Sequence, residues 1–323
     1  MKMLQRNISI DRIKIIATLM VLMLHTNLYL GRADYPLLLI VRTISGIAIP
    51  LFFSVSGYLM AGKTISINYA LRKVLNILKV TFIICFVFDI ISYFRTGTIA
   101  FSFPICFLQK GNWWHFWYFG TMIIIYLILP ILIRFINNKN LRVILLVLLC
   151  INTIMWILDI LLLFEKNHII QTFRLWYFLF YFLLGWYIRN HNNSLLSIQG
   201  KHVILLALFY TIIVKILPAG GIEYTFGSPF CVLYTLALFL FILQKPVHSK
   251  ATSIIESTVL PAYILHPMII RQIIIPIVCP ILIKLTTNPI LFEILIIPIT
   301  VIIVLLIAKV FTFLPYYSKV FRL

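Results

Sequence analysis

The chain is 323 residues long, of which 63% are hydrophobic and 11% are charged. Soluble proteins are roughly 45–50% apolar and roughly 25% charged. The composition therefore excludes a soluble enzyme, a disordered chain and a conventional nucleic-acid-binding protein. A helix that crosses a bilayer needs about 20 residues, so the apolar residues suffice for around ten such helices.

The formal net charge of +19 does not indicate a nucleic-acid partner, because the 27 Lys and Arg residues are scattered between apolar runs. In a membrane protein, such residues hold loops in the cytoplasm and meet anionic lipid. The five cysteines, at positions 85, 106, 150, 231 and 279, form no closely spaced pair. We therefore expect no metal site and no disulfide scaffold. The first apolar run is too long for a cleavable signal peptide.

Ten apolar runs follow one another with short connections. Only helices satisfy their backbone hydrogen bonds within spans of this length, so the prediction is an all-α, polytopic membrane bundle in one domain over residues 1–323. With the N-terminus inside, about two thirds of the Lys and Arg residues lie on the cytoplasmic side. This bias predicts that both termini are cytoplasmic. The runs cover about 13–30, 37–61, 77–94, 117–136, 141–163, 173–189, 202–217, 229–243, 258–283 and 290–313.

The first run carries a basic residue and a histidine eleven positions apart, Lys14 and His25. Eleven residues are about 20° more than three helical turns, which predicts that both side chains share one face about 16.5 Å apart. Lys14 is expected at the cytoplasmic edge and His25 beyond the midplane. A histidine at that depth is either functional or hydrogen-bonded to a neighbouring helix, and Lys14 can also simply reach the headgroups. Asp11 can pair with Lys14 or remain exposed.

Further polar residues fall at the ends of later runs. Ser56 suits close helix packing or a hydrogen bond to a neighbouring helix. Arg72, Lys73 and Lys79 follow in a predicted cytoplasmic loop, where clustered cations suit a phosphate-rich ligand or serve only as a topology signal.

Histidines also occur outside the first run. His115 lies in an aromatic run that includes Trp117 and Tyr118, which suits an interfacial belt or stacking on a sugar ring. His266 lies within a span, with Tyr263 on the same face, and has either a structural or a pocket-lining role. Three arginines expected toward the outer side can bind an acceptor or anionic lipid, or pair with Glu223 and Asp34; they are Arg42, Arg174 and Arg271.

The order of these motifs resembles acyltransferase family 3, a family of polytopic membrane proteins that O-acylate cell-surface sugars. The resemblance begins with an acid, a basic residue, ten intervening residues and a histidine, followed by Phe-Phe-x-x-Ser-Gly. It continues with a Trp-Tyr segment at 117–118, Phe-x-x-Gly-Trp-Tyr at 182–187 and Tyr-x-x-His-Pro at 263–267, and so covers essentially the whole chain. One departure is that Asn76 stands where the family commonly carries the second arginine of Arg-x-x-Arg.

The resemblance implies an O-acetyltransferase in the bacterial cytoplasmic (inner) membrane. Its donor would be acetyl-CoA, used as a substrate with no bound cofactor, and its acceptor a surface polysaccharide or a lipid-linked precursor. His25 would act as general base or acyl relay with Lys14 as its donor-side partner. The implied acyl-CoA contacts are Arg72, Lys73, Lys79 and Ser56, and the implied acceptor or pocket residues are His115, Trp117, Tyr118, Tyr263 and His266.

Two other classes share the composition. A flippase or permease for a lipid-linked sugar or small solute is weakly suggested by six prolines in the last two runs, although no matching set appears in the first half. A polysaccharide polymerase usually carries a large outer loop, and the chain shows none.

Overall fold

The computed structural model describes residues 7–30, 36–98, 101–191, 197–217, 221–247, 250–314 and 317, and the regular structure in these ranges is helical. Contacts between Cα atoms group the chain into two compact units, where the sequence analysis expects one domain. Unit 1 comprises Met1–Val55 and Asn193–Pro315, and unit 2 comprises Ser56–Asn192 and Tyr316–Leu323.

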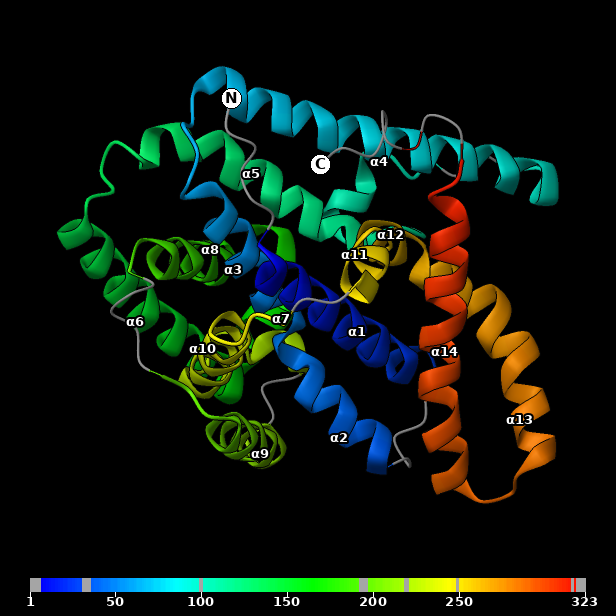
Figure 1. The fold of residues 1–323 in the computed structure, drawn as a ribbon. Helices are drawn as coiled ribbons and strands as arrows, with labels where there is room; N and C mark the ends of the chain where they lie inside the picture. Colours follow the sequence, from blue (N-terminus) through cyan, green and yellow to red (C-terminus); the bar gives the residue numbers. More distant parts are fainter. Residues whose placement is uncertain are drawn as a thin grey trace. The chain divides into compact units, whose positions relative to one another are not determined.

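Unit 1 is built around α1. This helix contacts α2, α10, α11, α12 and α14 (Figure 1). Its side chains are apolar over most of its circumference, which is typical of a helix surrounded by others. The helices of unit 1 are α1 (Ile8–Leu30), α2 (Pro36–Ile44), the start of α3 (Ala48–Met60), α9 (Gly200–Ile216), α10 (Pro229–Leu243), α11 (Lys250–Glu256), α12 (Val259–Ile269), α13 (Cys279–Leu285) and α14 (Pro289–Phe311).

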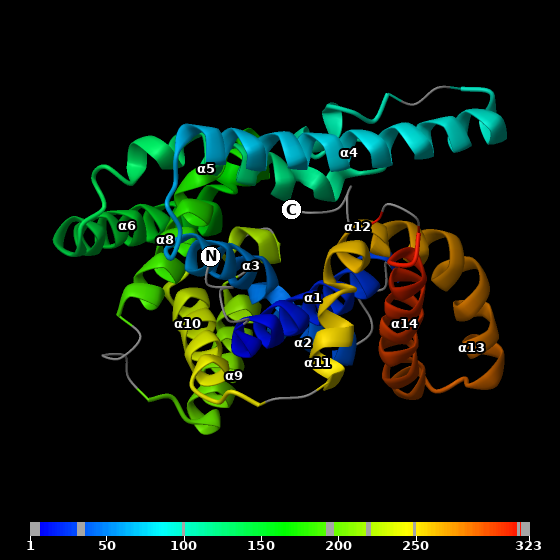
Figure 2. The same ribbon diagram turned by 45° about the horizontal axis from the view of Figure 1, so that its top comes forward.

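A π-helical stretch, Ile270–Val278, joins α12 to α13. Pro276 lies inside this stretch and Pro267 inside α12. Because proline lacks a backbone N–H and crowds the preceding turn, each of these positions loses one α-helical hydrogen bond. After a short turn, α14 returns beside α13, as both ribbon views show (Figures 1 and 2).

Unit 2 contains the longest helix, α4 (Ile67–Thr96), with α5 (Trp117–Leu132) packed along it (Figure 2). The Ser66 hydroxyl caps the start of α4 by accepting a hydrogen bond from the backbone N–H of Tyr69, and Gly97 ends it with φ of 71°. The other helices of unit 2 are α6 (Asn138–Leu162), α7 (Phe164–His168) and α8 (Leu175–Asn190), and α6 packs against α8.

Six helical stretches among the described residues are long and apolar enough to cross a membrane, so this is a membrane protein of helical type. They are 37–60, 67–96, 114–132, 139–162, 259–285 and 289–311. Each of the ten predicted runs falls largely on a helix, but α1, α8, α9 and α10 are not among the six. A total of ten spans and cytoplasmic termini therefore stay predictions; residues 1–6 and 318–323 lie outside the described ranges.

Candidate functional site

Two histidines from distant parts of the sequence meet inside unit 1. His25 comes from α1 and His266 from α12, and their ring centroids are 4.6 Å apart with planes tilted by 58°. His266 is fully buried and His25 is 8% exposed. Sequence spacing indicated each histidine separately, but their pairing depends on the packing of α1 against α12.

The hydrogen bonds of His266 define its proton positions. Its Nδ1 lies 2.8 Å from the carbonyl oxygen of Tyr263 and 3.2 Å from that of Ala262. A carbonyl oxygen only accepts, so Nδ1 carries the proton, and Nε2 is the basic nitrogen of the neutral ring. The Tyr263 ring lies 6.1 Å from the His266 ring and 6.4 Å from that of Phe52. The His266 ring therefore lies between the rings of His25 and Tyr263 in this chain of ring contacts.

Lys14 lies nearer the start of α1, which runs unbroken to His25 and beyond. Its Nζ is 3.2 Å from Asp11 Oδ1 and 3.0 Å from Glu256 Oε1. Asp11 was one of the partners considered from sequence, whereas Glu256 was missed. The chain has only eight acidic residues, and this scarcity could have marked Glu256 as a candidate partner for a partly buried cation. Its pairing with Lys14, however, depends on the packing of α11 against α1. Two carboxylates around one ammonium group leave a formal charge of −1.

The predicted acyl-CoA residues lie on α4 and at the end of α3, within unit 2. Arg72 is exposed, and its Nε donates to the backbone oxygen of Asn68 at 3.2 Å. Lys79 is also exposed, while Lys73 is half-buried. The structure corrects the predicted loop: all three lie within α4, two turns or less apart on one continuous helix, because the loop between α3 and α4 ends at Ser66.

Ser56 and Tyr118 are brought together in unit 2. Their hydroxyl oxygens are 3.5 Å apart, and either can donate. This contact joins the end of α3 to the start of α5. Ser56 is predicted to contact acyl-CoA, and Tyr118 is predicted to contact the sugar that receives the acyl group. The contact between them is also consistent with the simpler interpretation of Ser56 as a packing residue.

The aromatic run before α5 lies in the interior of unit 2. His115 is 2% exposed, with its ring 4.6 Å from that of Phe116 and 5.8 Å from that of Trp113. Trp117 is also buried, and its ring lies 5.1 Å from Phe178. An interfacial belt would leave these rings on the surface of the unit. The structure instead buries His115 and Trp117, because they pack against neighbouring aromatic rings and against α8.

Arg174 is paired, but not with either of the acids named from sequence. Its Nη1 lies 3.5 Å from Glu165 Oε2, and both residues are buried. Trp176 Nε1 donates to Glu165 Oε1 at 2.9 Å, and Asp159 Oδ1 accepts from the backbone N–H of Glu165 at 2.6 Å. Burial raises the pKa of Glu165 to about 8, although the charge of Arg174 opposes this rise. Sequence analysis missed Glu165, which precedes Arg174 by only nine positions.

Comparisons with known proteins show which family the chain belongs to. An amino-acid racemase of Enterococcus faecalis is 30% identical over 141 residues, which cover 40% of this chain. The match spans only 20% of the racemase's length. No solved structure matches the chain. The family model described as "Acyltransferase domain" matches residues 7–309, nearly the whole chain. The chain therefore belongs to acyltransferase family 3, as the order of its motifs indicates.

Proposed function

We propose that this protein is an O-acetyltransferase of the bacterial inner membrane. It transfers acetyl from cytoplasmic acetyl-CoA to a hydroxyl of a surface polysaccharide (O-antigen, capsule or exopolysaccharide) or of its lipid-linked precursor. Membership of the acyltransferase family supports acyl transfer. The observation that carries the proposal further is the buried pair of His25 and His266, with ring centroids 4.6 Å apart.

In this reaction, His25 removes the proton of the acceptor hydroxyl while the hydroxyl oxygen attacks the thioester carbonyl carbon. The tetrahedral intermediate then collapses, the carbon–sulfur bond breaks, and the proton passes from His25 to the departing CoA sulfur. His266 contacts the His25 imidazole and orients it. The Nε2 atom of His266 can accept a hydrogen bond from protonated His25, because the proton of His266 is on Nδ1, which donates to backbone carbonyls. An alternative route acetylates His25 first and the acceptor second.

The donor contacts are proposed to come from Arg72, Lys73 and Lys79 of α4, whose positive charges suit the phosphates of acetyl-CoA. Lys14 is proposed to lie at the cytoplasmic end of α1, where acetyl-CoA would bind. Because its ammonium already binds two carboxylates, a phosphate must compete with Asp11 and Glu256 for it. Within unit 1, the proposed acceptor or pocket residues are Tyr263 and His266, which lie beside one another.

The test is His25→Ala in membranes supplied with radiolabelled acetyl-CoA, with insertion of the variant confirmed. Loss of a general acid–base group should lower the transfer rate by about 10²–10⁴-fold. His168→Ala, at an exposed histidine of α7, is the matched control and should keep the wild-type rate. Transfer by His25→Ala at the wild-type rate would refute the assignment. Rapid denaturation at neutral pH without acceptor separates the two routes, because only the relay route leaves labelled acetyl on the protein and an acetyl-imidazole is lost quickly in acid.

A second test concerns Lys14. Lys14→Ala should raise the KM for acetyl-CoA more than it lowers kcat, since the proposed role is in donor binding. An unchanged dependence of the rate on acetyl-CoA concentration would contradict that role. Mass spectrometry of surface glycans from cells with and without the protein would identify the acyl group and the acceptor together.

A further inference from the structure

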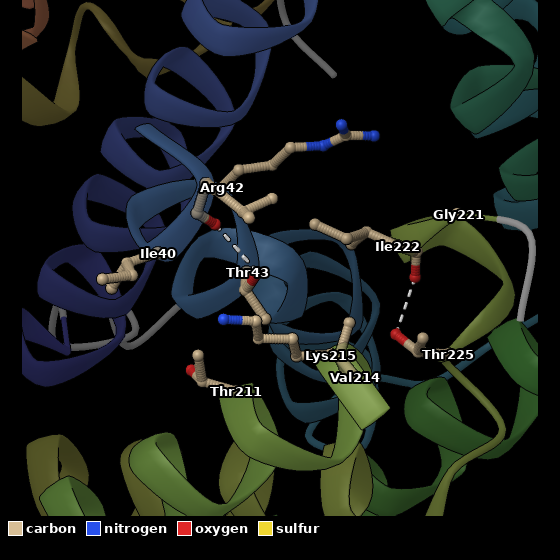
Figure 3. A pocket seen from close by; sticks show the side chains of 10 residues that line it. Ile40, Arg42, Thr43, Thr211, Val214, Lys215, Gly221, Ile222 and Thr225 are labelled. Carbon is tan, nitrogen blue, oxygen red and sulfur yellow. Dashed lines mark hydrogen bonds between the residues drawn. The ribbon is translucent and has the colours of Figure 1, made fainter. Parts of the chain in front are cut away.

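Unit 1 contains a cavity of about 240 Å³ that the proposed chemistry does not use (Figure 3). Its walls come from α2, α9 and the segment around Gly221–Thr225. Four of the ten lining residues are aliphatic: Leu39, Ile40, Val214 and Ile222. Leu39 and Ile40 are 44% and 47% exposed, so the cavity opens on an apolar surface of the unit.

The threonine hydroxyls of this cavity already donate their protons to the backbone. Thr43 donates to Leu39 at 2.9 Å, Thr211 to Ala207 at 2.8 Å and Thr225 to Ile222 at 2.7 Å. Figure 3 shows the first and last of these bonds as dashed lines. The donors left for a ligand are therefore the cationic side chains of Arg42 and Lys215.

These two cations leave the cavity in different directions in Figure 3. Within the described part of the chain, Arg42 Nε is buried without a hydrogen-bond partner. Lys215 is exposed in the last turn of α9. The carboxylate of Glu223 is close to Gly221, because a Cβ built on Gly221 would lie 3.1 Å from Glu223 Oε2. Two cations against one carboxylate leave the surroundings with a positive formal charge.

The cavity also lies at a suitable depth for a lipid headgroup. Arg42 is the sixth residue of the candidate span that begins at Leu37, or about 8 Å along it at 1.5 Å per residue. Ile212 and Ile216 of α9 are 51% and 65% exposed beside Lys215. An apolar slot near the end of a span, with basic side chains at its edge, is the arrangement that holds an acidic lipid.

We infer that this cavity binds one anionic phospholipid, with the phosphate on Lys215 and part of an acyl chain against Ile40 and Val214. The site adds lipid binding to the proposed transferase activity and does not depend on it. The exposed apolar rim favours a membrane lipid over a free anion, because a free anion would gain nothing from the aliphatic wall.

The experiment measures binding of fluorescent phosphatidylglycerol to the full chain in phosphatidylcholine nanodiscs. We expect saturable binding, about fivefold weaker in Lys215→Ala, because one basic residue near a charged headgroup contributes about that factor. Lys215→Arg should keep wild-type binding, and Val214→Trp, which fills the slot, should abolish it. Lys284→Ala is the matched control, since Lys284 is an exposed lysine in the last turn of α13.

Three results would overturn the inference: labelled phosphatidylcholine binding as tightly as phosphatidylglycerol, equal effects of Lys215→Ala and Lys284→Ala, or displacement of the label by inorganic phosphate alone. His25→Ala should bind the lipid normally. Failure of lipid binding with intact acetyl transfer would therefore reject only this site, and the reverse result would reject only the proposed function.

Discussion

Gly57 of α3 lies against the backbone of α8 at Phe182, within unit 2. A Cβ built on Gly57 would overlap the carbonyl oxygen of Phe182 and would lie 2.6 Å from its carbonyl carbon and 3.1 Å from its Cα. These neighbours are backbone atoms of a helix, so they cannot move aside as a flexible side chain can. Gly57→Ala must therefore push α3 and α8 apart.

The expected change in the free energy of unfolding of Gly57→Ala follows from two opposing effects. Overfilling a packed interior typically costs about 1–3 kcal/mol. Replacing glycine by alanine inside a helix contributes about 0.5–1 kcal/mol in the opposite direction. The net result is destabilisation at Gly57. Gly62→Ala is the matched control, because a Cβ there would lie at an ordinary 3.7 Å from Arg189 Nη2.

Unfolding can be followed with a thiol-reactive fluorophore as temperature rises, since Cys85 and Cys106 are buried in unit 2. Cys150 is exposed and is replaced by serine in every sample to remove background labelling. Gly57→Ala should lower the midpoint by several degrees, whereas Gly62→Ala should leave it nearly unchanged. Equal midpoints for the two variants would show that α3 and α8 do not approach as closely as the structure indicates.

The remaining predictions concern the buried charges beside α7. Arg174→Ala should destabilise the protein by about 1–3 kcal/mol, because the carbonyl oxygens of Ile169 and Glu165 lose the guanidinium that donates to them. Arg95→Ala, at an exposed arginine of α4, should cost less than about 0.5 kcal/mol in the same thermal assay. Stability should also fall as pH rises from about 4.5 to about 8, since the pKa of Glu165 is raised to about 8 and the folded protein keeps a proton that the unfolded chain has lost. Glu165→Gln should flatten this part of the pH profile, and a profile identical to wild type would contradict the raised pKa.

The sequence predicted the helical class, the membrane location and the family, because each rests on local or composition-level signals. Long apolar runs require helices in a bilayer whatever their packing. Six of these helices meet the length and hydropathy expected of a span. The shorter helices, such as α8 with 16 residues, do not, and length alone could not decide their role.

The candidate site was only partly predictable for a physical reason. Helical periodicity places Lys14 and His25 along one helix, so their spacing is a local property of the sequence. The meeting of His25 with His266, 241 positions later, depends on how α1 packs against α12. Likewise, sequence could name Arg174 as a cation that needs a partner, but could not select Glu165.

The amino-acid order by itself determined that the chain forms apolar helices and which of them carry imidazoles and cations, because backbone hydrogen bonding and hydropathy act over a few neighbouring residues. Only the tertiary structure decided which ionisable groups share an environment. Long-range partners such as Glu256 for Lys14 are selected by the packing of whole helices, and the energy of that packing is distributed over many side chains rather than encoded in any one motif.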